Sequence, residues 1–240
     1  MGKIFLTGIG PDGKNTMTAQ AEYAIKNCTA VCGYDKYVEQ VADIIPAGKP
    51  VFTSGMKGEV ERAETALQYA KEGHDVCLIC GGDPSLYSLA SLVYQLADHL
   101  VEIEVIPGVT AAMAASAILG APIADDLAII SMSDLLTPWE IIKKRIDGVN
   151  VGDFVAAVYN PKSMKRTQQI EYALKTFYDT RGDLITGTVK NAFREQQSAK
   201  ISKISDFDFD FVDMSSIVIV GCKKTIIKDG KMITPRGYPV

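Results

Sequence analysis

The sequence predicts an α/β protein in which parallel strands alternate with helices. Short apolar runs alternate along the chain with longer segments of helical periodicity. Three of these runs end directly in glycine turns, at Gly8, Gly81 and Gly108. Bare turns after buried strands are typical of the ligand-binding edge of an open parallel sheet. We therefore expect the three turns to lie along one carboxyl edge and to outline one pocket.

The first half contains five strand and helix pairs. The segment 59–72 shows why a helix is expected, since Val60, Ala63, Leu67 and Ala70 have helical spacing and Gly73 would end it. Strands are predicted at residues 3–7, 29–34, 51–54, 75–80 and 102–106. Helices are predicted at residues 16–26, 36–42, 59–72, 85–98 and 110–120.

The pattern breaks around residues 121–126, which predicts an N-terminal domain of residues 1–121 and a C-terminal mixed α/β domain of residues 122–240. Thr137 and Glu140 have the spacing of a capping box, with Pro138 at the first helical position. The alternating Asp and Phe of residues 206–211 fit either an edge strand or a polar loop. Further strands are predicted at residues 127–131, 153–159, 184–189 and 217–220, and a second helix at residues 163–178.

The composition is that of a compact soluble protein, with 240 residues, 47% hydrophobic and 22% charged. No apolar run approaches the roughly 20 residues of a membrane span. The first apolar run meets Gly8 and Gly10 too soon for a signal peptide. These features predict a cytoplasmic protein that does not bind a membrane.

Five cysteines, an odd number, fit a reducing compartment better than a disulfide framework. Cys77 and Cys80 form a C-x-x-C pair within a predicted strand. There they would face opposite sides, roughly 10 Å apart, so they cannot share a metal ion. Cys28, Cys32 and Cys222 are predicted core residues, and no metal site is expected.

The net charge of −4 argues against a general nucleic-acid binder. Acidic side chains are in excess over residues 1–125 and basic ones over residues 126–240. An anionic ligand would therefore be received by the second half.

The first glycine loop has two conflicting phosphate-binding interpretations. Gly8, Gly10 and Gly13 match G-x-G-x-x-G after a strand, with Asp35 at the end of the next strand, as in dinucleotide-binding proteins. The loop also nearly matches a P-loop, except that Asn15 stands where a hydroxyl should hold magnesium. Pro11 weakens both, because it has no N–H to offer to an anion.

Glycine, proline and polar motifs follow one another along almost the whole chain: Gly8-Ile9-Gly10-Pro11, Gly81-Gly82-Asp83-Pro84, Pro107-Gly108-Val109-Thr110-Ala111, Ser131-Met132-Ser133-Asp134-Leu135-Leu136-Thr137-Pro138-Trp139, Tyr159-Asn160-Pro161, Asn191-Ala192 and Thr234-Pro235-Arg236-Gly237-Tyr238. In these motifs the chain resembles the tetrapyrrole methyltransferases. It resembles more closely the family that methylates C17 of precorrin-3B or cobalt-precorrin-3. The fourth and last motifs are the most specific.

The resemblance implies a two-domain homodimer that binds S-adenosylmethionine in the cleft between its domains and releases S-adenosylhomocysteine. Asp83 would hold a polar part of the cofactor, and Tyr159 and Ala192 would line its adenosyl side. The implied cofactor contacts are Pro11, Gly81, Gly82, Asp83, Leu86, Thr110, Ala111, Tyr159 and Ala192. The substrate, a flat apolar macrocycle fringed with carboxylates, needs cations at its rim, for which the candidates are Lys162, Arg166, Lys190, Arg194 and Arg236, with Gly10 also at the substrate.

The implied reaction is C17 methylation with contraction of the ring to precorrin-4 or cobalt-precorrin-4, in cobalamin and porphyrin biosynthesis. Contraction requires proton transfers. The polar groups of the most specific motif, Ser131, Ser133, Asp134 and Thr137, are therefore candidate catalytic residues. In the alternative interpretation Asp134 and Thr137 cap the following helix.

Two other functions stay open on the sequence. One is a methyltransferase of the same superfamily that acts at another tetrapyrrole position. The other is a nucleotide-binding protein that uses Gly8 to Gly13 on phosphate. Neither His74 nor His99 is expected to act as a base.

Overall fold

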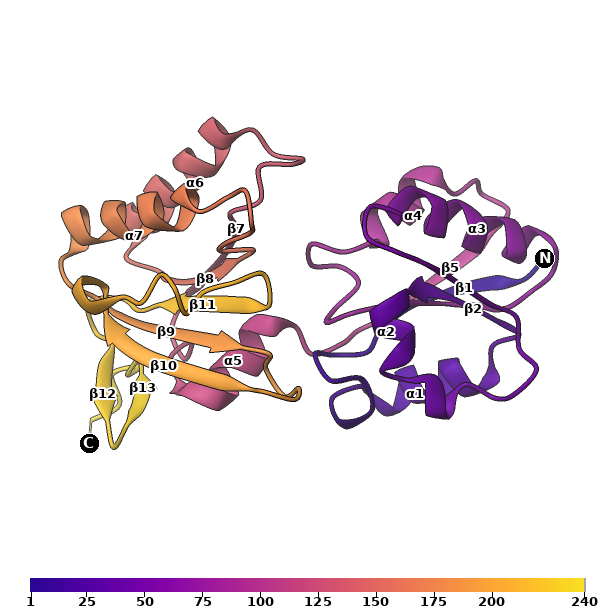
Figure 1. The fold of residues 1–240 in the computed structure, drawn as a ribbon, viewed down its shortest axis with the longest axis horizontal. Helices are drawn as coiled ribbons and strands as arrows, with labels where there is room; N and C mark the ends of the chain where they lie inside the picture. The colour runs from indigo at the N-terminus through magenta and orange to yellow at the C-terminus, as the bar shows by residue number, and fades with distance from the viewer. Residues whose placement is uncertain (240) are drawn as a thin grey trace. The chain divides into compact units, whose positions relative to one another are not determined.

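The computed structural model describes residues 1–239, which form two compact units that divide after Ala111 (Figure 1). The predicted boundary lay after residue 121. Helix α5 (Ala111–Leu119) accounts for the difference, because its contacts are mainly with the second unit. Each unit has its own sheet and core.

The first unit contains a five-stranded parallel sheet in the order β3-β2-β4-β1-β5. The predicted fold class is confirmed here, and all five strands lie within a few residues of their predicted positions. The central pair, β1 and β4, is flanked by strands on both sides, so both of its edges are hydrogen-bonded within the sheet. The strands are β1 (Lys3–Gly8), β2 (Ala30–Tyr34), β3 (Val51–Ser54), β4 (Val76–Cys80) and β5 (Glu102–Ile106).

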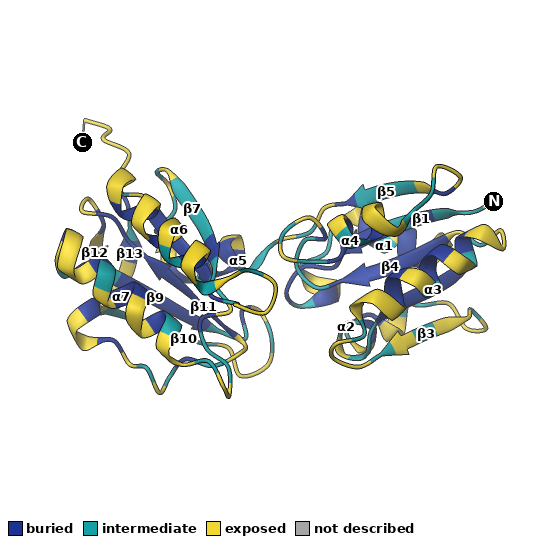
Figure 2. Cartoon of the chain, turned by 90° about the horizontal axis from the view of Figure 1, so that it is seen from above, coloured by how far each residue is buried: buried dark blue, intermediate teal, exposed yellow. Residues whose placement is uncertain are grey.

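Helices cover both faces of this sheet, so the inner strands β2 and β4 are almost wholly buried, while the edge strands β3 and β5 are partly exposed (Figure 2). Helices α3 (Glu59–Lys71) and α4 (Ala90–Leu96) pack on one face, where Cys80 lies. Helices α1 (Ala19–Asn27) and α2 (Asp35–Glu39) pack on the other, where Cys77 lies. The two cysteines therefore face opposite sides of β4, as predicted, and burial raises the pKa of Cys80 to about 11.

Several helices of the first unit differ from their prediction in their bounds or in their buried face. Helix α4 is shorter than residues 85–98, because residues 84–89 are in turns that follow Asp83. In α3, Val60 is 50% exposed, while Ala66 is buried with Ala63 and Leu67. Helix α1 begins at Ala19, where Thr18 accepts the backbone N–H of Ala21 as its N-cap.

The second unit contains a mixed five-stranded sheet in the order β10-β9-β11-β8-β7. Strands β7 and β8 are parallel, and the other neighbours are antiparallel. The predicted mixed α/β domain is thus confirmed. The strands are β7 (Leu127–Ser131), β8 (Val155–Tyr159), β9 (Ile185–Lys190), β10 (Ser198–Lys203) and β11 (Ser216–Val220).

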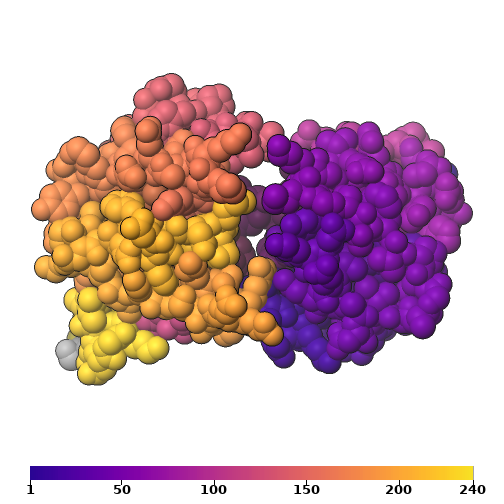
Figure 3. Space-filling view, in the orientation of Figure 1, coloured from indigo at the N-terminus to yellow at the C-terminus, as the bar shows by residue number. Residues whose placement is uncertain are grey.

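Helices α6 (Trp139–Gly152) and α7 (Gln168–Arg181) cover one face of this sheet, with Phe177 fully buried beneath them. Leu119 of α5 and Met232 lie against Gly187 on the other face. Met232 belongs to a second, three-stranded sheet of β12 (Ile226–Lys228), β13 (Lys231–Ile233) and β6 (Gly120–Ala121). Residues of β12 and β13 reach the surface of the unit, in the yellow region of Figure 3.

Two local features of the second unit differ from the prediction, and the structure decides between the two alternatives for residues 206–211. Strand β10 was missed. Residues 206–211 form no strand. Phe207 is buried and Asp208 is exposed, so the alternation of Asp and Phe reflects which side chains face the core and which face solvent. Helix α6 has Pro138 as its N-cap with no side-chain hydrogen bond, so the predicted capping box is wrong.

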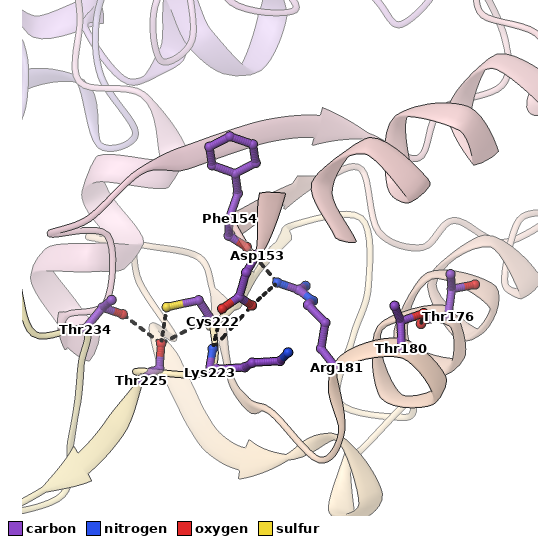
Figure 4. Close-up of polar contacts among 9 residues, drawn as sticks. All are labelled: Asp153, Phe154, Thr176, Thr180, Arg181, Cys222, Lys223, Thr225 and Thr234. Atoms are coloured by element: carbon purple, nitrogen blue, oxygen red, sulfur yellow. Dashed lines mark hydrogen bonds and ion pairs between the residues drawn. The ribbon is translucent and has the colours of Figure 1, made fainter. Parts of the chain in front are cut away.

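A buried polar cluster joins the ends of α6 and α7 in the second unit (Figure 4). Arg181 is 7% exposed and donates from Nη1 to the carbonyl oxygen of Phe154 at 2.9 Å and to Asp153 Oδ1 at 3.3 Å. Beside it, Thr234 Oγ1 donates to the carbonyl oxygen of Pro122 at 2.6 Å and bonds to Thr225 Oγ1 at 2.8 Å. Thr234, from the specific C-terminal motif, therefore attaches the end of β13 to the end of β6.

No helix among residues 1–239 combines the length and the apolar character that crossing a membrane requires.

Candidate functional site

The three glycine turns of the first unit meet at the carboxyl ends of β1, β4 and β5, as predicted. Gly10 and Gly82 exchange backbone hydrogen bonds of 2.9 and 3.1 Å. A Cβ added to Gly108 would lie 2.1 Å from the carbonyl oxygen of Gly82 and 3.0 Å from Cα of Gly8. The turns touch through bare backbone, so glycine is required where they cross.

Asp83 joins two of these turns. Its Oδ1 accepts the backbone N–H of Ser85 at 2.8 Å, and its Oδ2 accepts that of Gly108 at 3.0 Å. Both carboxylate oxygens therefore bond to backbone within the unit. Asp83, in the turn after β4, thus fixes the position of the turn after β5.

Three backbone donors at the start of the first glycine loop are used inside the protein. The N–H of Ile9 donates to the carbonyl oxygen of Cys80 at 3.0 Å, that of Gly10 to Gly82, and that of Asp12 to Thr16 Oγ1 at 3.0 Å. Pro11 has no N–H. A phosphate site needs several such groups converging on the anion, so these contacts count against the interpretation of this loop as a phosphate cradle.

The turns do leave room for a ligand at one glycine. A Cβ at Gly82, whose φ is +67°, would meet no atom closer than Cα of Thr110 at 3.9 Å. Gly81, in contrast, is covered by the ring of Tyr37, which a Cβ would approach to 2.4 Å. Gly82 is therefore the glycine whose backbone faces open space. Of the other candidate cofactor residues here, Pro11 is buried and Leu86, Thr110 and Ala111 are partly buried.

This surface of backbone and small side chains fits S-adenosylmethionine better than a phosphorylated nucleotide. It offers an uncharged wall to an adenosyl group and holds one carboxylate, Asp83, with no cationic side chain among the candidate residues. Among residues 1–239 there is also no group of three or more His, Cys, Asp or Glu side chains that could hold a metal ion. The expectation that no metal is needed stays a prediction.

Two further candidate cofactor residues lie in the second unit. Tyr159 ends β8, and its Oη accepts the backbone N–H of Ala112 in the first turn of α5 at 2.9 Å. The phenol thus satisfies one of the N–H groups that a helix N-terminus leaves without an intrahelical partner. Ala192 is buried just beyond β9.

The most specific motif follows β7 and is tied to the loop that follows β8. Ser131 Oγ accepts Nδ2 of Asn160 at 2.9 Å and the backbone N–H of Ser133 at 3.2 Å. Asp134 Oδ2 accepts Nε2 of Gln169 at 3.0 Å, and its Oδ1 lies 3.9 Å from Nη1 of Arg166. Asp134 therefore does not cap α6. The partners Asn160 and Gln169 were missed in the sequence, although the side-by-side ends of β7 and β8 could have indicated them.

The candidate substrate cations have different surroundings. Lys162 Nζ donates to the carbonyl oxygen of Phe209 at 2.7 Å, and Arg166 Nη2 donates to that of Asn160 at 2.9 Å. Lys190 pairs with Asp213 at 2.7 Å. Arg194 is partly buried and Arg236 is exposed. Leu135, which follows the catalytic candidate Asp134, is also exposed. Lys162, Arg166 and Lys190 therefore hold loops of their own unit together.

The fold is that of a two-unit α/β protein, and the glycine turns at the carboxyl edge of its parallel sheet form a candidate small-molecule site. The family model described as "Tetrapyrrole (Corrin/Porphyrin) Methylases" matches residues 3–208. The chain belongs to this family, whose members are S-adenosylmethionine-dependent methyltransferases.

Two known proteins are similar to the chain over nearly its full length. It is 41% identical over 239 residues to the "Probable cobalt-factor III C(17)-methyltransferase" of Salmonella typhimurium, covering 98% of this chain and 99% of that protein. It is 46% identical over 240 residues to the "Cobalamin biosynthesis protein CbiHC" of Archaeoglobus fulgidus, covering 99% of this chain and 53% of that protein. The chain thus spans about half the length of the Archaeoglobus protein.

A solved structure described as the methyltransferase CobJ superposes with a TM-score of 0.90 at 30% identity, over 98% of this chain and 100% of that one. The predicted fold class and family are therefore confirmed.

Proposed function

We propose that the chain transfers a methyl group from S-adenosylmethionine to C17 of cobalt-factor III or of its precorrin-3 counterparts, in cobalamin biosynthesis. The observation that carries the proposal is the match to the Salmonella protein, which extends over nearly the whole of both chains. The specific motifs after β7 and at the C-terminus favour this position of methylation over another position on the ring.

The first unit supplies the cofactor wall in this proposal. S-adenosylmethionine carries an activated methyl group on its sulfonium, so the protein has mainly to orient the two reactants and exclude water. Gly82 leaves open space at its Cα, Thr110 borders that space, and the Asp83 carboxylate fixes the turn that carries Thr110. Tyr159 and Ala192 stay proposed cofactor contacts of the second unit.

Ring contraction remains part of the proposal. Of the candidate catalytic groups, Ser131 is the one whose contacts suit a proton donor. Its oxygen accepts two hydrogen bonds, from Asn160 and Ser133, so its hydroxyl proton is the group left to donate. Asp134 pairs with Arg166, which suits a structural carboxylate better than a general acid.

The chain is further proposed to act as a cytoplasmic homodimer, on the resemblance alone.

The test is a transfer assay with methyl-labelled S-adenosylmethionine and either cobalt-factor III or precorrin-3B. The proposal predicts one labelled methyl group on the tetrapyrrole, placed at C17 by NMR, together with S-adenosylhomocysteine. The relative turnover of the two substrates reports whether cobalt is required. Methylation at any other carbon, or none on either substrate, would contradict the proposal.

A further inference from the structure

The two loops that follow the parallel strands β7 and β8 are held together by polar contacts. The β7 loop (residues 132–138) and the β8 loop (residues 160–167) are joined by the Asn160–Ser131 hydrogen bond and the Arg166–Asp134 ion pair. The β8 loop is closed on itself, since Ser163 and Arg166 exchange backbone hydrogen bonds of 2.9 and 3.3 Å. Both loops are therefore fixed at the same edge of the sheet.

These fixed loops expose large apolar side chains. Of the four most exposed large hydrophobic residues in the described chain, Leu136 (98%), Met164 (96%), Val151 (91%) and Leu135 (83%), three belong to the two loops. Burying such side chains against a ligand or partner is favourable. The packing within the unit gives no reason for their exposure, and exposed apolar side chains of this kind mark interaction sites. We define Leu135, Leu136 and Met164 as the apolar patch.

We propose that the apolar patch binds one face of the tetrapyrrole macrocycle and so positions the substrate. The inference rests on the proposed function and extends it to residues that no cofactor assignment includes. Charge supports this occupant, because Lys165 is exposed next to Met164 and would meet a ring carboxylate. The one acidic residue beside the patch, Asp134, is compensated by Arg166.

A second copy of the chain fits the patch less well. Stable interfaces bury about 1,200–2,000 Å² in total, far more than three side chains provide. A planar apolar ring, in contrast, needs only a few side chains against one face. The patch therefore has the size and the flanking charge of a ligand contact.

Asp134 becomes a positioning residue in this arrangement. Its carboxylate accepts a hydrogen bond from Nε2 of Gln169 and pairs with Arg166. These two contacts determine where the β7 loop places Leu135. A positioning role predicts that Asp134→Asn raises KM for the tetrapyrrole several-fold with little change in kcat or its pH profile. A fall in kcat at unchanged KM, with a changed pH profile, would assign Asp134 to the chemistry and overturn this part.

The patch is tested by a binding measurement that needs no turnover. The single tryptophan, Trp139, begins α6 three residues after Leu136, so bound cobalt-factor III should quench its fluorescence. We expect the double variant Leu135→Ser, Leu136→Ser to weaken this binding about tenfold or more. S-adenosylhomocysteine affinity should be unchanged.

The matched control is Val151→Ser, which removes an equally exposed apolar side chain at the other end of α6 and should bind cobalt-factor III like the wild type. Equal affinity of the double variant and the wild type would overturn the inference. A change in the molecular mass of the double variant in solution would also overturn it, by assigning the patch to a contact between copies. Failure of the wild type itself to bind cobalt-factor III would count against the proposed function instead.

Discussion

The carboxylate of Asp83 accepts the backbone N–H of Gly108 at 3.0 Å, across 25 residues of sequence. This bond connects the turn after β4 with the turn after β5, whose strands lie on either side of β1 in the sheet. Hydrogen bonds to a charged group contribute about 1.5–3 kcal/mol. The shape of the proposed cofactor wall therefore depends on a single carboxylate.

Gly108→Ala is expected to disrupt the crossing of the turns. Its Cβ would lie 2.1 Å from the carbonyl oxygen of Gly82, which is backbone and cannot rotate away. We expect a loss of about 3 kcal/mol in the free energy of unfolding. The measurement is urea unfolding followed by circular dichroism.

Gly148→Ala is the matched control for that variant. Gly148 lies within α6 and a Cβ there would meet no atom within 4 Å. Alanine should stabilise the helix by up to about 1 kcal/mol. If Gly108→Ala were as stable as Gly148→Ala, the close approach of the turns would be refuted.

Arg181→Met should destabilise the second unit. The Arg181 side chain is 1% exposed, and removing it leaves Asp153 and the carbonyl oxygen of Phe154 without their donor. We expect a loss on the order of 3 kcal/mol, measured by urea unfolding. The double variant with Asp153→Asn should lose less than the two single losses added together, because the pair acts as a unit. Strict additivity would show that the two side chains are not coupled.

Acid should weaken the second unit through Asp213. Burial raises the pKa of this carboxyl, but hydrogen bonds from Lys190, Ser215 and Ser216 outweigh burial and lower the pKa to about 2. A group whose folded pKa is depressed stabilises the fold above its unfolded pKa, about 3.9, and loses that contribution as the pH falls through its folded pKa. The contribution of Asp213 should therefore disappear between about pH 4 and pH 2.

The comparison for this prediction is Asp213→Asn, which should be less stable than the wild type at pH 7 and closer to it at pH 2. Urea unfolding at both pH values gives the difference. Asp210→Asn, at an exposed residue of the preceding loop, is the control. A difference between wild type and Asp213→Asn that is independent of pH would contradict the assignment.

Much of the first unit could be predicted because its strands are short apolar runs with glycine at their ends. The meeting of the turns at Gly8, Gly81 and Gly108 followed from the parallel order alone, although Gly82 is the glycine of the second turn that makes the contact. What could not be predicted was how the polar groups pair. Asp83 looked like a ligand contact, yet its partners are the N–H groups of Ser85 and Gly108, which no pattern of side chains reveals.

The second unit was harder because its polar residues find partners distant in sequence. Thr137 had capping-box spacing, but α6 begins without a side-chain cap. Lys162 and Arg166 are predicted at a substrate rim, which stays a prediction, and the sequence did not show that they also donate to backbone carbonyls of their own unit. Strand β10 was missed because its sequence, Ser198 to Lys203, is polar at an exposed sheet edge, where apolar alternation is not required.

The most direct test of the cofactor site is calorimetric titration with S-adenosylhomocysteine of the wild type, Asp83→Ala and the control Asp43→Ala. Asp43 is an exposed carboxylate of the same unit that pairs with Lys14. The account predicts measurable binding to the wild type and to Asp43→Ala, and affinity about tenfold lower or worse for folded Asp83→Ala. Equal affinity of all three proteins would contradict the placement of the cofactor at the joined glycine turns.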